Sequence, residues 1–208
     1  MKTEHKIGEP FLKAKSYKLK ACSGFTIIET LVAISILLLS ITGPLTIAEK
    51  GLASAEAARS EITAFYLAQE AIEYIRNVRD SNAIAGRGGK QNWLQGLNQC
   101  LGIPDIDSGC GIDPTANSGQ QVQQCSQVSN DNCALYQYNG INVNLTGLLG
   151  HRSTTGWQKT DFMRKVYIQE VTEDVEVKVS VTMQWIAGSL GPRKITVSEN
   201  MLNWYESP

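Results

Sequence analysis

The chain has 208 residues, of which 42% are hydrophobic and 19% are charged, a composition typical of a folded protein with one or two small domains. Residues 1–24 carry six lysines and two glutamates, whereas the remainder carries thirteen basic and eighteen acidic residues. A nucleic-acid-binding domain needs a basic stripe on its folded part, so this distribution argues against nucleic acid as a partner. It fits a membrane protein whose positive end stays in the cytoplasm.

The first predicted element is a membrane-spanning helix over residues 25–48. Between Phe25 and Ala48 the chain has one charged residue, Glu29. Twenty-four helical residues rise about 36 Å, which is enough to cross a hydrocarbon core of about 30 Å. The segment therefore indicates a single-pass membrane protein.

Three other interpretations of this segment fit less well. An ordinary secretory signal would be cut near residues 53–55, about a dozen residues beyond the densest apolar stretch. A lipoprotein signal ending at Cys22 would need an apolar run where Lys18 and Lys20 stand. An uncleaved signal anchor explains the lysines and the span, but it does not explain Glu29.

Glu29 separates these interpretations. Inserting an acidic residue into a membrane helix costs roughly 2.5–3.5 kcal/mol, so such a residue usually has a partner or a function. The helix dipole recovers at most about 2 kcal/mol for a negative charge near the amino end. Cleavage between Gly24 and Phe25 would supply a positive partner, the new α-amino group of Phe25.

The stretch from Lys18 to Glu29, KLKACSGFTIIE, is followed by an apolar helix and resembles the class III signal of type IV pilins and type II secretion pseudopilins. The resemblance implies that a prepilin peptidase removes a basic leader, residues 1–24, by cutting after Gly24, and then methylates Phe25. It also implies that Glu29 neutralises the terminal amine of a neighbouring subunit as a filament grows.

The same resemblance implies a structural subunit, a minor pilin or pseudopilin, of a type IV pilus or of a type II secretion or competence-type filament. Its partners would be prepilin peptidase, other pilin subunits through the N-terminal helix, the inner-membrane assembly machinery and membrane lipid. The part that follows the helix would be extracytoplasmic. The rival hypothesis is a single-pass anchored binding domain that does not polymerise.

A helix kink is expected at Gly43 and Pro44, because proline gives no N–H to the preceding turn and clashes with it. In the pilins that this chain resembles, a helix breaker at about this depth lets a short stretch unwind in the filament. The alternative is a proline that a membrane helix simply tolerates.

Residues 49–80 are expected to continue the helix as an amphipathic stem, which makes the whole helix about 80 Å long. The predicted buried stripe consists of apolar residues spaced by three and four. They are Ala48, Leu52, Ala55, Ala58, Ile62, Phe65, Ala68, Ile72 and Ile75.

Residues 81–161 are predicted to be a variable loop region. Four of the five cysteines lie here: Cys100, Cys110, Cys125 and Cys133. Their spacing lacks the short Cys pairs of structural zinc sites, so disulfides are favoured over metal binding or free thiols. Four cysteines allow three pairings, and the sequence does not choose among them.

Three aspartates in this region, Asp105, Asp107 and Asp113, are weak candidates for calcium ligands. Some pseudopilins bind calcium in a late loop. The sequence lacks the ordered acidic ladder and terminal glutamate of an EF-hand, however, so a solvated acidic loop is the better explanation of the aspartates. No cofactor is otherwise expected.

Residues 162–208 are predicted to form an antiparallel β-meander. Apolar and polar residues alternate from Val175 to Trp185, which indicates a half-buried strand. Further strands are expected near 164–171 and 194–201. The predicted fold is α+β, a pilin-like lollipop with a long N-terminal helix packed on a small antiparallel sheet.

Nothing in the sequence indicates an enzyme. After removal of the leader, His151 would be the single histidine, and it has no nucleophile or carboxylate at motif spacing. A set of scattered serines is not a catalytic triad without a positioned base.

Overall fold

The computed structural model describes residues 24–87, 93–104, 106–125 and 133–204. The chain divides into two compact units, Met1–Ile47 and Ala48–Pro208. The predicted leader, apart from Gly24, lies outside the described residues.

Helix α1 runs from Ile27 to Asn82 and belongs to both units. It continues through Gly43 and Pro44 as helix, and the kink expected there stays a prediction. Within the first unit, serine and threonine hydroxyls donate to carbonyls one turn earlier, for example Ser40 to Leu37 and Thr46 to Gly43, both at 2.8 Å. These hydroxyls therefore need no outside partner in an apolar environment.

The apolar side chains that the structure describes in the first unit are exposed, from Ile27 (86%) to Ile47 (73%). Among the described residues, α1 is the one helix that is long and apolar enough to cross a membrane. This segment has no apolar partner among the described residues of its unit, and an apolar surface of this size is typical of a segment covered by lipid or protein.

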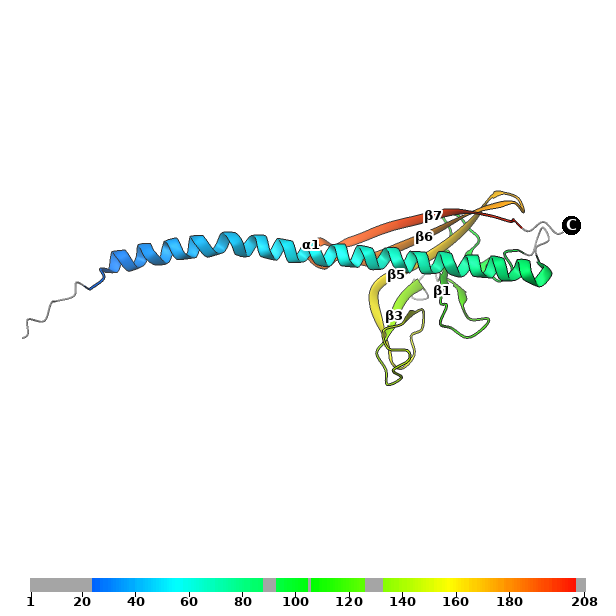
Figure 1. Cartoon of the computed structure of the whole chain (residues 1–208), viewed down its shortest axis with the longest axis horizontal. Coiled ribbons are helices and arrows are strands. Elements are labelled where there is room, and N and C mark those ends of the chain that lie inside the picture. The colour runs from blue at the N-terminus through cyan, green and yellow to red at the C-terminus, as the bar shows by residue number, and fades with distance from the viewer. Residues whose placement is uncertain (1–23, 88–92, 105, 126–132, 205–208) are drawn as a thin grey trace, which may run out of the picture. The chain divides into compact units, whose positions relative to one another are not determined.

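The described residues of the second unit include a seven-stranded sheet in which all strand pairs are antiparallel. Its strands are β1 (Cys110–Ile112), β2 (Val122–Gln124), β3 (Ala134–Tyr138), β4 (Leu149–Gly150), β5 (Trp157–Thr172), β6 (Glu176–Ile186) and β7 (Pro192–Leu202). The long strands β5, β6 and β7 form the predicted meander, and they run beside the second part of α1 (Figure 1).

Strand β5 is the centre of this sheet. It pairs with β3 through its first half, with β6 through its second half, and with β1 where Cys110 lies opposite Val166. The strands β1 to β4 lie within residues 81–161, where the sequence indicated no strands. They are two to five residues long, too short for alternation to mark them in the sequence.

The core of the second unit forms where β1, β3, β5 and β6 meet one face of α1. On α1 that face holds Ala64, Leu67, Ala68, Ala71, Ile72 and Ile75. The prediction was right for Ala68, Ile72 and Ile75 but wrong for the earlier part of the stripe. Leu52, Ile62 and Phe65 are 67%, 58% and 46% exposed. Small alanines occupy the buried face instead, which lets the helix approach the sheet closely.

Short helical turns connect the main elements of the second unit: η1 (Ala83–Arg87), η2 (Asn98–Cys100) and η4 (Gly188–Leu190). Two disulfides join Cys100 to Cys110 and Cys125 to Cys133, with Cα–Cα distances of 4.7 and 5.5 Å. The first lies within the apolar core and ties η2 to β1. The predicted disulfides are thus present, and the structure decides their pairing.

The α+β class is confirmed, since the chain has one long N-terminal helix and an antiparallel sheet. The predicted strands also agree with β5, β6 and β7, which extend a few residues further than the sequence indicated.

Candidate functional site

The first candidate site is the start of α1, where Gly24, Phe25 and Thr26 precede the first helical residue. Phe25 is 76% exposed. The Thr26 hydroxyl accepts a hydrogen bond from the backbone N–H of Glu29 at 3.3 Å. Thr26 is thus the N-cap of α1, and the Thr-x-x-Glu sequence has the spacing of a capping box. The Gly24–Phe25 bond lies in non-helical backbone just outside this cap, and such backbone can enter a peptidase site.

Glu29 lies in the first turn of α1 and is exposed. Its carboxylate makes no ion pair with any residue that the structure describes. The partial positive charge of the helix N-terminus favours a negative charge at this position. Glu29 therefore lies within one turn of Phe25, with an exposed carboxylate.

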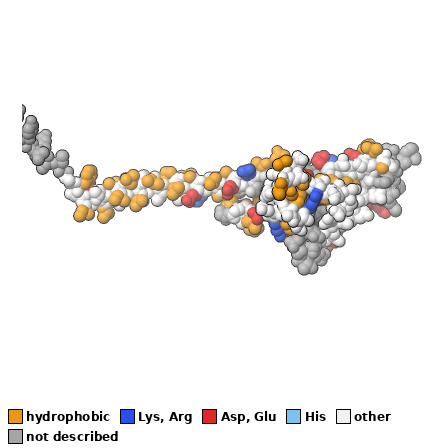
Figure 2. Space-filling model, turned by 90° about the horizontal axis from the view of Figure 1, so that it is seen from below, with side chains coloured by type: hydrophobic (Ala, Val, Ile, Leu, Met, Phe, Trp, Pro, Cys, Tyr) orange, Lys and Arg blue, Asp and Glu red, His pale blue; other side chains and the backbone are white. Residues whose placement is uncertain are grey.

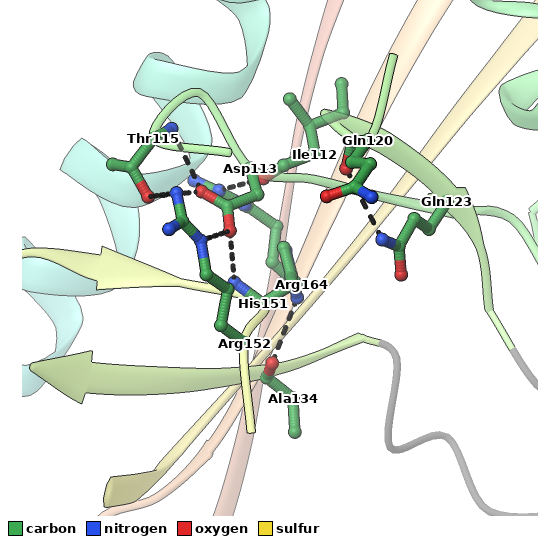
Figure 3. A network of polar contacts seen from close by, with 9 residues as sticks. All are labelled: Ile112, Asp113, Thr115, Gln120, Gln123, Ala134, His151, Arg152 and Arg164. Atoms are coloured by element: carbon green, nitrogen blue, oxygen red, sulfur yellow. Dashed lines mark hydrogen bonds and ion pairs between the residues drawn. The ribbon is translucent and has the colours of Figure 1, made fainter. Parts of the chain in front are cut away.

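The second candidate site is a polar cluster centred on Asp113, which is 3% exposed (Figure 3). The N–H and hydroxyl of Thr115 donate to one carboxylate oxygen of Asp113 at 2.9 and 2.6 Å. The N–H of His151 and the Nε of Arg152 donate to the other oxygen at 3.0 and 3.4 Å. Burial raises the pKa of Asp113, but these hydrogen bonds and the Arg152 charge outweigh burial and lower the pKa below its ordinary value.

Gly150 allows this arrangement. A Cβ at Gly150 would lie 2.8 Å from an oxygen of Asp113, so a side chain there would push the carboxylate away. The backbone N–H of the next residue, His151, then reaches Asp113. Strand β4 thereby ties the end of β1 to the loop that carries Arg152.

His151 is held as a neutral imidazole. Burial, followed by the positive charge of Arg164, lowers its pKa from 6.5 to about 4. Its Nδ1 lies 2.9 Å from the carbonyl oxygen of Ala134, so in the neutral ring Nδ1 carries the proton and donates. Its Nε2 is buried with no hydrogen-bond partner among the described residues.

Two cations fix the edges of the cluster. Arg164 of β5 has no exposed area, and it donates to the carbonyls of Leu67 on α1 and Ile112 on β1. The guanidinium of Arg152 lies over the ring of Trp157, 5.4 Å from its centroid. Such cation–π contacts contribute about 0.5–1 kcal/mol at exposed sites.

The predicted site residues fall in separate places. Asp113 is held in the cluster, whereas the Asp107 carboxylate accepts a hydrogen bond from the N–H of Ile103 at 2.6 Å. Asp105 lies outside the described residues. In the part of the chain that the structure describes, no group of three histidine, cysteine or acidic side chains is gathered to hold a metal ion. Calcium binding therefore stays an untested prediction.

Sequence reasoning missed the partners of Asp113, namely Thr115, His151 and Arg152. Thr115 is within local reach, and an Asp-x-Thr pattern of this kind signals an Asx-type turn. His151 and Arg152 lie 38 and 39 residues from Asp113 in the sequence, and no local sequence pattern predicts their contact with it.

Residues 19–43 match the family model described as the prokaryotic N-terminal methylation motif. The match includes Gly24, Phe25 and Glu29, which the structure places around the N-cap of α1. The motif supports a type IV pilin-like precursor of the kind that prepilin peptidase processes. Its exposed apolar N-terminal helix is then a membrane anchor. Neither the curated proteins nor the solved structures contain a significant match to the chain.

Proposed function

We propose that this chain is a minor pilin or pseudopilin, a structural subunit of a type IV pilus or of a type II secretion or competence-type filament. The observation that carries the proposal is the placement of Gly24, Phe25 and Glu29 at the start of an apolar helix, within the methylation motif. Cleavage after Gly24 removes the lysine-rich leader and leaves the apolar helix in the membrane.

Assembly would follow from charge pairing. Cleavage creates an α-amino group on Phe25, and Glu29 offers a carboxylate that has no partner among the described residues. In a dry helical bundle the attraction between opposite charges is several times stronger than in water. A Glu29 carboxylate that meets the amine of an adjacent subunit therefore offsets the cost of burying both charges, and it fixes the relative position of the two helices.

The second unit would lie outside the cytoplasmic membrane. Disulfides form in oxidising compartments, and two are present in this unit. The lysine-rich residues 1–24 would stay on the cytoplasmic side. The exposed apolar side chains of α1 in this unit, Leu52, Ile62 and Phe65, would contact neighbouring subunits.

The first experiment measures the N-terminal mass of the full chain expressed with and without a prepilin peptidase. The proposal expects a mature chain that begins at methylated Phe25 only when the peptidase is present. A chain that begins at Met1 under both conditions would support the anchored, non-polymerising domain. A chain that begins near residue 56 would indicate an ordinary secreted protein.

The second experiment tests assembly separately from processing. Glu29→Gln keeps the size of the side chain and removes its charge, and Glu49→Gln makes the same change at an exposed position after the apolar segment. We expect Glu29→Gln to be cleaved and folded but to be lost from sheared filaments, whereas Glu49→Gln should be incorporated as wild type. Equal incorporation of both variants would contradict the assembly role of Glu29.

A further inference from the structure

A cavity of about 240 Å³ opens beside the Asp113 cluster. One wall is the loop between β1 and β2, which carries Asn117 and Gln120, together with Gln123 of β2. The other wall is the segment after β4, which carries Arg152 and Thr154. In the view of Figure 3, Gln120 and Gln123 lie on one side of Asp113 and Arg152 lies on the other. We call this cavity the amide cup.

The walls of the amide cup are held in place before any ligand arrives. The N–H of Asp113 donates to the carbonyl of Gln121 at 2.7 Å, and the N–H of Gln120 donates to that of Asn117 at 3.0 Å. Asp113 then joins this loop to the opposite wall through His151 and Arg152. A preformed site of this kind loses little conformational entropy when it binds.

The cup is electrically neutral near pH 7. The Asp113 carboxylate is ionised and pairs with the Arg152 guanidinium, and the His151 ring carries no charge. An anion would meet a cation that is already paired, and a metal ion would meet a carboxylate whose two oxygens already accept four hydrogen bonds. The charge balance thus favours a neutral ligand.

The polar groups that remain are mostly amides. The side-chain amides of Asn117 and Gln120 make no hydrogen bond with any residue that the structure describes, and the Oε1 of Gln123 is likewise without a donor there. Each amide offers both a donor and an acceptor. Groups of this kind suit a ligand that also carries a donor and an acceptor on each polar atom, which is the property of a hydroxyl group.

We propose that the amide cup binds one ring of a neutral sugar. The volume of 240 Å³ is below the range of about 300–1,000 Å³ typical of drug-sized ligands, so it suits a single ring. The ring hydroxyls would pair with the amides of Asn117, Gln120 and Gln123, and the paired Arg152 would donate to one hydroxyl. This binding is independent of processing and filament assembly, because every residue involved lies in the second unit.

The test is isothermal titration of the full chain in a detergent micelle without sugar headgroups, which would otherwise compete. The probes are methyl glucoside, methyl galactoside, methyl mannoside and N-acetylglucosamine, each to about 50 mM because contacts of this kind give millimolar affinities. Glucuronate and inorganic phosphate serve as anionic probes. To separate free sugars from polysaccharide ends, a trisaccharide of any sugar that binds is titrated as well.

Two variants locate the binding. We expect Asn117→Ala and Gln120→Ala each to raise the dissociation constant for the bound sugar by about five- to tenfold, which is the effect of losing one hydrogen bond. Gln169→Ala removes the same kind of side chain from an exposed position on β5, away from the cup, and should leave binding unchanged. Thermal unfolding of each variant confirms that it is folded.

Saturable binding of a neutral sugar that weakens in both cup variants supports the proposal. The proposal is overturned if no neutral probe binds the folded wild-type chain, if only the anions bind, or if the cup variants bind as tightly as Gln169→Ala.

Discussion

Arg164 of β5 donates from Nη1 to the Glu70 carboxylate of α1 at 2.6 Å, from a side chain with no exposed area. The same nitrogen donates to the carbonyl of Leu67 at 2.7 Å, and Nη2 donates to the carbonyl of Ile112. One buried cation therefore ties the helix to two strands of the sheet. Its charge is balanced by a carboxylate that is itself 40% exposed.

Removing the carboxylate should destabilise the second unit. Glu70→Ala leaves the Arg164 charge buried with carbonyl acceptors alone, so we expect the free energy of unfolding to fall by about 2–3 kcal/mol. Glu73→Ala removes an exposed partner of Arg76 one turn further along α1, and it should change stability by less than about 1 kcal/mol. Urea unfolding of the detergent-solubilised chain compares the two variants. Equal effects would contradict the anchoring role of Arg164.

Acid should destabilise the second unit through His151. The folded-state pKa of about 4 lies below the ordinary value of 6.5, so the unfolded chain binds a proton more readily than the folded chain. This contribution to stability is complete above pH 6.5 and is lost as the pH falls toward 4. The loss should reach about 2.5 kcal/mol at pH 4.5.

His151→Gln should remove this pH dependence between pH 7 and 4.5, which unfolding curves at several pH values will show. The lowered pKa of Asp113 contributes little to the pH dependence between pH 7 and 4.5, because the stability that an ionised aspartate provides is lost at still lower pH. An unchanged slope in the variant would mean that other groups carry the acid sensitivity.

The two disulfides should differ in their contribution to stability. They close loops of similar size, with sequence separations of 10 and 8, so the chain-entropy model gives each of them roughly 2.5–3 kcal/mol. All four cysteines are buried, but Cys100 and Cys110 belong to the main apolar cluster, whereas Cys125 and Cys133 do not. Replacing the first pair with alanine therefore loses more packing. We expect Cys100→Ala/Cys110→Ala to cost about 1–2 kcal/mol more than Cys125→Ala/Cys133→Ala. Thermal unfolding under non-reducing conditions measures the difference, and the reverse order would contradict this prediction.

The assignment of faces on α1 can be tested with two leucines. Leu67 is 8% exposed and Leu52 is 67% exposed. Leu67→Ala should therefore cost about 2–5 kcal/mol, whereas Leu52→Ala should stay within about 0.5 kcal/mol. Denaturant titration of both variants provides the comparison. A large loss of stability for Leu52→Ala in the isolated, unassembled chain would contradict this assignment. It would mean that the buried face of α1 includes Leu52, as the sequence predicted.

The comparison of Leu67 with Leu52 is informative because α1 carries apolar side chains on more than one face. Apolar side chains recur along the N-terminal segment, and further apolar side chains appear on the visible face of the second unit (Figure 2). Sequence spacing of three and four produces apolar positions on more than one face of such a helix. Leu52, Ile62 and Phe65 satisfy that spacing as well as Ala64, Leu67 and Ala71 do.

Features whose physical cause is local could be predicted from the amino-acid sequence. The processing motif lies within a dozen contiguous residues, and the charge of Glu29 is conspicuous because its neighbours are apolar. The long strands β5, β6 and β7 were predictable because alternation over eight or more residues reports a half-buried sheet surface. The disulfide chemistry followed from the number and spacing of the cysteines.

Features that join distant segments of the chain depend on the tertiary structure. The cysteine pairing, the buried face of α1, and the meeting of Asp113 with His151 and Arg152 all depend on how β1 and β4 add to the sheet around β5. These strands are two to three residues long, and their own sequence carries too little preference to specify a partner. Two contributions favour that arrangement: packing against the core, and burial of the Arg164 charge beside Glu70. Both depend on contacts between distant segments, so the local sequence cannot report them.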